Sequence, residues 1–165
     1  MFRASLARLR SRGRVRPEGR VRIGRGVRFH LAPGARVTLG DGARIGAGTR
    51  FHVHGQARIG AGAQLGERCV VAAHERVEIG AGAVLDDEVV LIDFDHGISD
   101  VERPVRLQEL MTAPVVIGER AVLSAGATVL RGVVVGPGAR VQPRGVVTRD
   151  VPAGATVGGV PARPV

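Results

Sequence analysis

Residues 117–147 read IGERAVLSAGATVLRGVVVGPGARVQPRGVV, and in this stretch an aliphatic residue returns at every sixth position. The series is Ile117, Leu123, Val129, Val135, Val141 and Val147. An α-helix repeats about every 3.6 residues and a half-buried strand every second residue, so neither period explains the series. Glycine follows the aliphatic residue in IGER, VGPG and the earlier IGAG segments, where a tight corner needs a positive φ. The spacing predicts short strands joined by tight corners.

The first half of the chain repeats with a slightly longer period. Three consecutive segments of equal length, 39–58, 59–78 and 79–98, align with one another and begin LGDG, IGAG and IGAG. Three sides of about six residues make one turn of a triangular prism, and stacked turns continue columns of aliphatic residues. An antiparallel sandwich would require regular alternation and hairpin turns, which are sparse here. We therefore predict an all-β fold, a parallel β-helix.

Length and composition fit one domain with a thin core. The chain has 165 residues with 25 Gly, no Lys, Trp or Tyr and four Phe, so the interior must consist of small and branched aliphatic side chains. The single cysteine, Cys69, precedes two valines and is expected to be a buried thiol. We assign residues 1–20 to a basic N-terminal segment with a short capping helix over about residues 2–11, and residues 21–165 to the β-helix domain.

The net charge of +9 is concentrated near the N-terminus, where eleven of the arginines fall between Arg3 and Arg36. Arginine clusters attract anionic partners. Nucleic-acid modules add aromatic platforms or a recognition helix, which are not visible here, so we expect no specific nucleic-acid partner. The basic N-terminal segment also suits contact with a membrane surface. No apolar run has the length of a spanning helix and the first residues lack the apolar middle of a secretion signal, which predicts a cytoplasmic protein.

Residues 93–115 interrupt the repeat and form the expected site. A prism filled with side chains has no internal pocket, so its chemistry is expected on an excursion from the surface. The excursion begins DFDH, which supplies Asp93, Asp95 and His96. A histidine exchanges protons near neutral pH, and a nearby carboxylate can orient it and stabilise its charged form. This pattern predicts that His96 is a general base assisted by a carboxylate. Either Asp93 or Asp95 could orient its ring, and regular strand alternation slightly favours Asp93 because Asp95 adjoins His96 and would point away from it.

Three segments together resemble the hexapeptide-repeat acyltransferases, in particular their sugar and polysaccharide O-acetyltransferase branch. They are DFDHG at 93–97, APVVIGERAVLSAGATVLRGVVVG at 113–136 and VVTRDVPAGATVGGVPARPV at 146–165. The resemblance covers about residues 21–165. It implies a left-handed β-helix and transfer of an acetyl group from acetyl-CoA to a hydroxyl of a sugar or polysaccharide precursor. It also implies that His96 is the catalytic base, and Arg106 and Gln108 are plausible contacts to the acceptor.

The same resemblance places CoA in a groove between neighbouring β-helices of a homotrimer. The implied CoA contacts are Ala125, Arg144, Gly145, Arg149 and Arg163. Two positions depart from the family pattern: Pro143 has no backbone N–H to donate, and Val122 stands where a tryptophan is common. We expect Val133 and Val146 to lie on a flat outer side that a threefold assembly could bury.

Two alternatives of other classes stay open. The departures at Pro143 and Val122 would fit a non-catalytic β-helix scaffold. A zinc protein like the gamma-class carbonic anhydrases is disfavoured, because the close histidine pair of that pattern, five residues apart, is missing. We expect no metal, predict that His54 and His74 form a stacked ladder continued by Phe94, and expect His52 and His54 to point to opposite faces.

Overall fold

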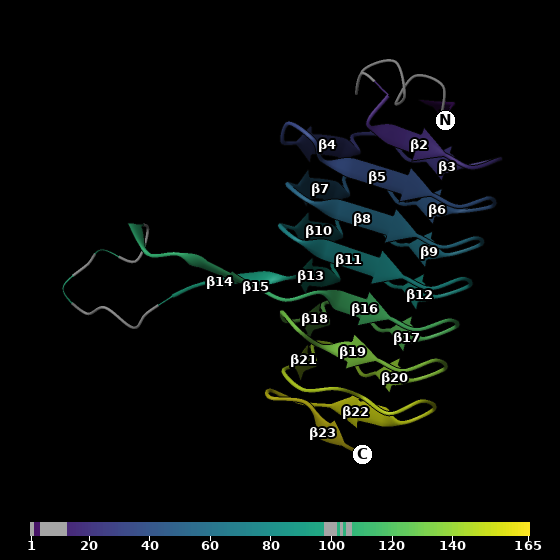
Figure 1. The fold of residues 1–165 in the computed structure, drawn as a ribbon. Helices are drawn as coiled ribbons and strands as arrows, with labels where there is room; N and C mark the ends of the chain where they lie inside the picture. Colours follow the sequence, from purple (N-terminus) through teal and green to yellow (C-terminus); the bar gives the residue numbers. More distant parts are fainter. Residues whose placement is uncertain (1, 4–12, 98–101, 103, 105–106) are drawn as a thin grey trace.

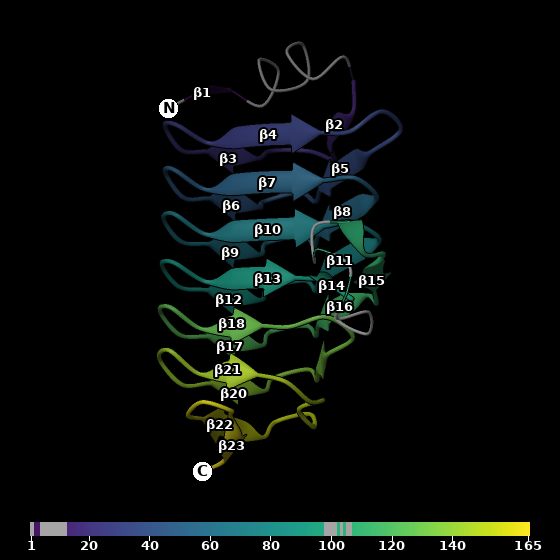
Figure 2. The ribbon, with the colours of Figure 1, turned by 90° about the vertical axis from the view of Figure 1, so that its left-hand side faces the viewer.

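The chain folds into a left-handed parallel β-helix in the shape of a triangular prism. The computed structural model describes residues 2–3, 13–97, 102, 104 and 107–165. Three sheets form the sides of the prism, and the chain passes along them in the same order in each of about seven turns (Figures 1 and 2). The direction of the strands in the two views gives the left-handed sense. This confirms the fold predicted from the period of six.

We call the three sides face 1, face 2 and face 3, in the order in which each turn meets them. Face 1 comprises β2 (Val15–Pro17), β5 (Arg36–Leu39), β8 (Gln56–Ile59), β11 (Arg76–Ile79), β16 (Val115–Ile117) and β19 (Val134–Val135). Face 2 comprises β1 (Phe2–Arg3), β3 (Arg22–Ile23), β6 (Arg44–Ile45), β9 (Gln64–Leu65), β12 (Val84–Leu85), β17 (Val122–Leu123), β20 (Arg140–Val141), β22 (Thr156–Gly158) and β23 (Arg163–Pro164). Face 3 comprises β4 (Arg28–Leu31), β7 (Arg50–Val53), β10 (Val70–Ala73), β13 (Val90–Ile92), β18 (Thr128–Val129) and β21 (Val146–Val147).

The core consists of columns of aliphatic side chains that run down the prism. On face 2 the column is Ile23, Ile45, Leu65, Leu85, Leu123, Val141 and Val157, with every member no more than 6% exposed. Each residue lies directly over its counterpart one turn away, because the parallel strands pair in register. Burying one such side chain is worth about 1.5–3 kcal/mol, so the repeated column is the main stabilising element.

The length of a turn changes along the chain, although the columns stay aligned. Val15 pairs with Val37 across a turn that is longer than the period seen in the sequence. Leu39, Ile59 and Ile79 then pair in the register that the three aligned segments predict, and Leu123 pairs with Val141 across a shorter turn that keeps the period of six. The longer early turns are accommodated by longer strands on faces 1 and 3 and by the corner between them. Strand register rather than turn length is therefore maintained along the prism.

The corners depend on glycine because successive turns approach closely there. A Cβ on Gly46 would overlap the carbonyl oxygen of Gly66 and lie 2.6 Å from the backbone nitrogen of Glu67. The amide of Gly46 donates to the carbonyl oxygen of Leu65 at 2.7 Å, which fixes the spacing of the two turns. Two residues further along, Gly48 has a φ of 71°, a conformation that costs other residues energy. The glycine that directly follows the aliphatic residue is thus required by backbone stacking and not by a positive φ as we predicted, since the positive φ falls two residues later.

The two ends of the prism add short antiparallel strands. β1 pairs with β3, and β23 pairs with β22. The β-helix begins at β2, within the segment that we assigned to residues 1–20, and the expected capping helix falls mostly on residues 4–12, outside the described residues. Among the described residues there is no helix of the length and apolar character needed to span a membrane. Cys69 is fully buried as predicted, and burial raises the pKa of its thiol.

One outward position was predicted incorrectly. Val133 is only 2% exposed and belongs to the core, because it lies two residues before the inward Val135 and strand side chains alternate. Val134 between them is 43% exposed, and Val146 is half-buried at the outer surface. Val134 lies on face 1 in β19 and Val146 lies on face 3 in β21, so these two outward valines do not share the one flat side that we expected.

Replacing Gly46 with alanine should destabilise the fold by about 3 kcal/mol, because two backbones would have to separate to admit the methyl group. Urea denaturation measures this change in the free energy of unfolding. Ala47→Ser, at the adjacent corner position, is the matched control and should change stability by no more than about 0.5 kcal/mol. Equal stability of Gly46→Ala and the wild type would contradict the close approach of these turns.

Candidate active site

The interruption in the repeat is an antiparallel hairpin that projects from one corner of the prism. Its strands are β14 (Phe94–His96) and β15 (Leu110–Thr112), with Asp95 opposite Met111 and His96 opposite Leu110. The hairpin leaves after β13 and returns before β16, at the corner between face 3 and face 1 (Figures 1 and 2). The amide of Ala113 donates to the carbonyl oxygen of Asp93 at 2.9 Å and closes the base. The expected excursion is confirmed.

Asp93 is completely buried at the base of this hairpin. Its carboxylate accepts hydrogen bonds from three backbone amides of the preceding turn, those of His74 at 2.7 Å, Glu75 at 2.8 Å and Arg76 at 2.6 Å. A buried carboxylate is stable only when such donors replace water. Asp93 therefore ties the hairpin to the turn that precedes it, a structural role that our sequence reading did not foresee.

The period of the first half of the chain contains the signal for this role. Val53 pairs with Ala73 in the ladder, and the register of the next turn places Asp93 after Ala73 in the same inward column. A charged residue at an inward position of a repeat must be buried, and its oxygens must then find local donors. The corner at residues 74–76, which supplies three amides, is the nearest source.

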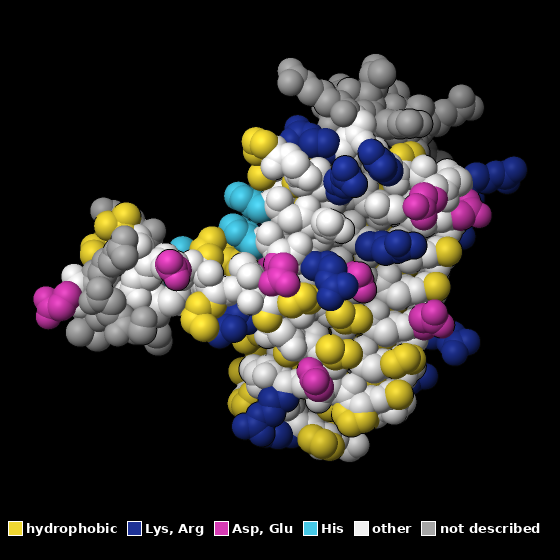
Figure 3. All heavy atoms as spheres, in the orientation of Figure 1, with side chains coloured by type: hydrophobic (Ala, Val, Ile, Leu, Met, Phe, Trp, Pro, Cys, Tyr) yellow, Lys and Arg dark blue, Asp and Glu magenta, His cyan; other side chains and the backbone are white. Residues whose placement is uncertain are grey.

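Beside Asp93 the predicted aromatic ladder is present. The rings of His54 and His74 stack with centroids 4.1 Å apart and planes 12° from parallel, and the ring of Phe94 continues the column 4.1 Å from His74. A second pair, His30 and His52, stacks at 4.8 Å on face 3. In Figure 3 the histidines gather on the prism beside the base of the hairpin. His52 and His54 both lie at the outer surface, contrary to our expectation, because Phe51 and Val53 occupy the inward positions.

One histidine of each stacked pair has a lowered pKa. Partial burial lowers the pKa of His74, and positive charge on His54 or His96 lowers it further, while Asp93 acts in the opposite sense. Partial burial also lowers the pKa of His52, with contributions from His30, Arg50 and His54. Neutral imidazoles stack without mutual repulsion, so the lowered pKa values of His74 and His52 fit the observed stacking.

His96 is exposed on β14, two residues beyond Phe94. Within the described part of the chain its imidazole makes no hydrogen bond, so both ring nitrogens are available to a substrate. Asp95 is exposed and its carboxylate accepts the backbone amide of His96 at 2.8 Å. The oxygens of Asp93 are held by the three amides of residues 74–76. Which carboxylate orients His96 stays a prediction.

The two proposed acceptor contacts lie on the far part of the hairpin. Gln108 is half-buried, and its side-chain oxygen would lie 3.8 Å from a Cβ placed on Gly97. It thus faces the strand that carries His96. Arg106 lies outside the described residues.

The proposed CoA contacts lie at a different corner, between faces 2 and 3. The amide of Ala125 makes no hydrogen bond inside the described chain, whereas both backbone groups of Gly145 are used, its N–H by Gln142 and its C=O by Thr128. Arg144 has a φ of 58°, and its aliphatic stem lies under Gly126 of the previous turn. The corner therefore offers one free amide donor and an exposed guanidinium, with Pro143 contributing no donor.

The remaining arginines predicted to contact CoA are near the C-terminus. Arg149 is exposed at the corner between faces 3 and 1, and Arg163 is exposed on β23, where it donates to its neighbouring carbonyl, that of Ala162, at 3.0 Å. Along face 3, one corner carries Ala125 and the opposite corner carries the hairpin with His96. One chain therefore does not bring the two groups of predicted residues together.

No metal site is formed by the described residues, since no group of three His, Cys, Asp or Glu side chains there could hold an ion. The histidines that come together are stacked face to face, a geometry in which their nitrogens do not converge on one point.

Comparison with known proteins places the repeat and the fold in context. Residues 114–143 match the family model described as the hexapeptide repeat of succinyl-transferase. Over 51 residues the chain is 49% identical to 2,3,4,5-tetrahydropyridine-2,6-dicarboxylate N-acetyltransferase of Staphylococcus aureus strain JH9, a match that covers 31% of this chain and 21% of that enzyme. The chain thus spans about a fifth of the length of the curated relatives that it matches.

Solved structures match nearly the whole chain. An N-acyltransferase of Bacillus cereus, AntD, in complex with dTDP and coenzyme A, superposes with a TM-score of 0.82 at 15% identity, over 99% of this chain and 88% of that one. A maltose O-acetyltransferase of Clostridium difficile 630 superposes with a TM-score of 0.63 at 18% identity, over 100% of this chain and 77% of that one. At these identities the similarity establishes a shared hexapeptide-repeat β-helix fold.

Asp93→Asn should destabilise the protein by about 2–4 kcal/mol, because an amide removes one acceptor oxygen and presents an N–H group to backbone donors. Thermal and urea denaturation measure the loss. Asp95→Asn is the control, since Asp95 is exposed, and it should leave the midpoint unchanged. If both variants unfolded at the wild-type midpoint, Asp93 would not be the tie between hairpin and prism.

Acidification should destabilise the ladder. The pKa of folded His74 lies below the ordinary value of 6.5, so as the pH falls through that value the unfolded chain takes up the proton first. The stability of the neutral ladder is complete above this pH and is lost as the pH falls through the lowered pKa. Thermal midpoints measured between about pH 8 and pH 5 should therefore fall, and His74→Phe, which keeps an aromatic ring without a titrating group, should reduce the slope. An unchanged slope in His74→Phe would refute this origin.

Proposed function

From the hexapeptide-repeat β-helix that this chain shares with known acyltransferases, we propose that it is an acyl-CoA-dependent O-acyltransferase. The transferred group is acetyl and the acceptor is a hydroxyl of a sugar or polysaccharide precursor. The observation that supports this most directly is the exposed imidazole of His96, which has no hydrogen-bond partner among the described residues. It stands on a hairpin that leaves the prism beside the stacked rings of His54, His74 and Phe94.

The proposed chemistry needs no covalent enzyme intermediate. Neutral His96 removes the proton from the acceptor hydroxyl as the oxygen forms a bond to the thioester carbonyl carbon. The carbon–sulfur bond then breaks, and the imidazolium returns the proton to the departing CoA sulfur. The products are the acetyl ester and free CoA thiol, with His96 neutral again. We propose that one of two carboxylates, that of Asp93 or that of Asp95, orients the ring.

We propose that the complete site lies between two copies of the chain in a homotrimer. His96 and the free amide of Ala125 are at opposite corners of face 3, so a site that uses both requires the hairpin of one copy to reach the Ala125 corner of another. Leu107, Leu110 and Met111 are 53%, 38% and 50% exposed on the projecting hairpin, which suits burial against a neighbour. Arg144, Arg149 and Arg163 would then be available to CoA phosphates.

The second candidate is a non-catalytic scaffold, and it rests on one specific observation. Where the preceding turn offers the free amide of Ala125, the next turn presents Pro143, so the corner lacks a second donor for the amide-rich pantetheine arm. The two candidates differ in whether acetyl-CoA binds and turns over.

His96→Gln should lower the rate of CoA-thiol release from acetyl-CoA and a panel of sugars by about 100-fold or more, because the general base is lost. A free-thiol reagent measures the release. His30→Gln, which removes a histidine of the other stacked pair, is the control and should retain the wild-type rate.

Two results would contradict the acyltransferase. One is equal turnover by His96→Gln and the wild type. The other is no thiol release by the wild type together with no thermal stabilisation by acetyl-CoA, which would favour the scaffold.

A further inference from the structure

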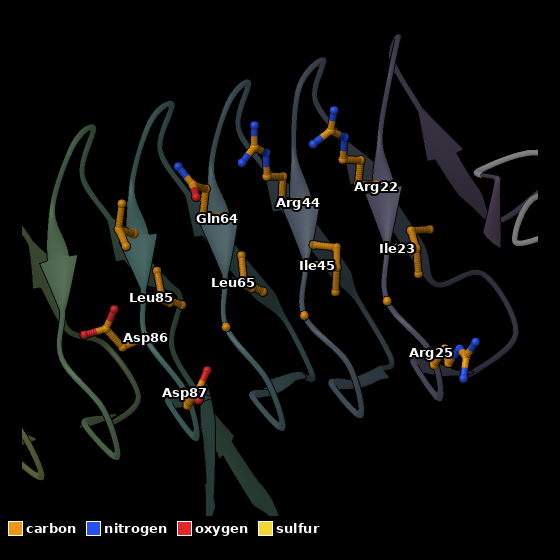
Figure 4. A pocket seen from close by; sticks show the side chains of 14 residues that line it. Arg22, Ile23, Arg25, Arg44, Ile45, Gln64, Leu65, Leu85, Asp86 and Asp87 are labelled. Atoms are coloured by element: carbon orange, nitrogen blue, oxygen red, sulfur yellow. The ribbon is translucent and has the colours of Figure 1, made fainter. Parts of the chain in front are cut away.

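A groove of about 530 Å³ runs along face 2, on the side of the prism opposite the hairpin corner. It extends over the first four turns. One border is the corner between faces 2 and 3, where Gly24, Gly46 and Gly66 are followed in the fourth turn by Asp86 and Asp87. Its charged and polar side chains are Arg22, Arg25, Arg44, Gln64, Asp86 and Asp87 (Figure 4). The volume is in the range of small-molecule sites, roughly 300–1,000 Å³. Neither the predicted base nor the predicted CoA contacts line it.

One end of the groove concentrates positive charge. Arg22 and Arg44 pair in register on adjacent strands, and Figure 4 shows their side chains side by side and pointing the same way. Adjacent strands lie about 4.8 Å apart, and like charges directly opposite one another are destabilising. Neither guanidinium forms an ion pair with a described residue. Arg25 adds a third exposed guanidinium at the neighbouring corner.

The opposite end carries carboxylates. Asp86 and Asp87 occupy the corner of the fourth turn, and both are exposed. Asp87 accepts the backbone amide of Glu67 at 2.7 Å, while the Asp86 carboxylate makes no hydrogen bond within the described chain. Between the ends, the position that holds Arg22 and Arg44 becomes Gln64 and then Val84. Asp86 belongs to the turn of Val84, so Arg44 and Asp86 lie two strand spacings apart along the prism axis, about 10 Å, and the charge changes sign over that length.

We propose that this groove binds a phosphorylated polyol, with the phosphoryl group at Arg22 and Arg44 and hydroxyl groups at Asp86. Two guanidinium groups side by side match the oxygens of a phosphoryl group and lose their repulsion when it binds. A carboxylate accepts hydrogen bonds from hydroxyl groups but repels a second phosphate. A ligand with one anionic end and one hydroxyl-rich end is thus complementary to the groove along its length. The proposal does not depend on acetyl transfer.

The ligand chemistry has two sources, a soluble sugar phosphate and the headgroup of a glycerophospholipid. Calorimetry with glucose 1-phosphate and with inorganic phosphate tests the soluble source. Co-sedimentation with phosphatidylglycerol vesicles, compared with phosphatidylcholine vesicles, tests the lipid. Binding of either polyol phosphate in preference to its comparison ligand supports the proposal and identifies the source.

The double variant Arg22→Gln/Arg44→Gln should weaken binding by about tenfold or more. Arg36→Gln/Arg58→Gln is the matched control, because it removes the same charge from exposed positions on face 1 and should bind as the wild type does. Asp86→Asn should weaken binding of glucose 1-phosphate or of the vesicles and leave the binding of inorganic phosphate unchanged. Thiol release from acetyl-CoA, measured in parallel, keeps the outcome separate from that of the proposed function.

Three results would overturn the proposal. If the two double variants lost equal binding affinity, the loss would come from the lower net charge and not from the groove. Equal affinity for inorganic phosphate and glucose 1-phosphate, together with no preference for phosphatidylglycerol, would show an anion site without polyol recognition. A change of oligomeric state in Arg22→Gln/Arg44→Gln, seen by analytical ultracentrifugation, would show that a second copy of the chain occupies the groove.

Discussion

The close stacking of one turn on the next is the constraint on which the whole molecule depends. Backbone groups of each corner bond to the turn that follows, as the amide of Gly46 does to Leu65, and the approach leaves no room for a Cβ on Gly46. Given that spacing, aliphatic residues at equivalent positions fall into continuous columns, and the core forms without aromatic bulk. The hairpin and the groove on face 2 both lie on the outside of this stack.

The hairpin shows how such a stack accommodates an insertion. Residues 94–112 leave the prism, yet Ile79 still pairs with Ile117, so the column continues as if the insertion were absent. The cost of opening the corner is offset by the buried carboxylate of Asp93, which satisfies three amides of the preceding turn. Because the hairpin is anchored there, His96 is held at a defined distance from the prism, beside the ladder of His54, His74 and Phe94.

Charge is distributed along the prism axis rather than evenly over its surface. Arginines line the groove on face 2 in the first two turns, and Asp86 and Asp87 line it in the fourth. One end of the groove is therefore positively charged and the other negatively charged. Arg68 lies at the transition, where its guanidinium contacts Glu88 at 3.1 Å and Glu67 at 3.2 Å. The face opposite the hairpin corner thus carries opposite charges at the two ends of its groove.

The amino-acid sequence alone predicts the β-helix, its inward columns, the ladder of His54 and His74 and the place of the excursion, because each follows from a period that is visible in one dimension. The inward position of Val133 is visible in the sequence too, because Val133 continues the buried column of Ala121, Ala127 and Ala139 at the same period of six, and our prediction missed it. The role of Asp93 required the tertiary structure, because its three donors belong to the previous turn. The groove on face 2 depends on side chains from four turns, and only the register of the stacked strands brings Arg22 beside Arg44 and sets both apart from Asp86.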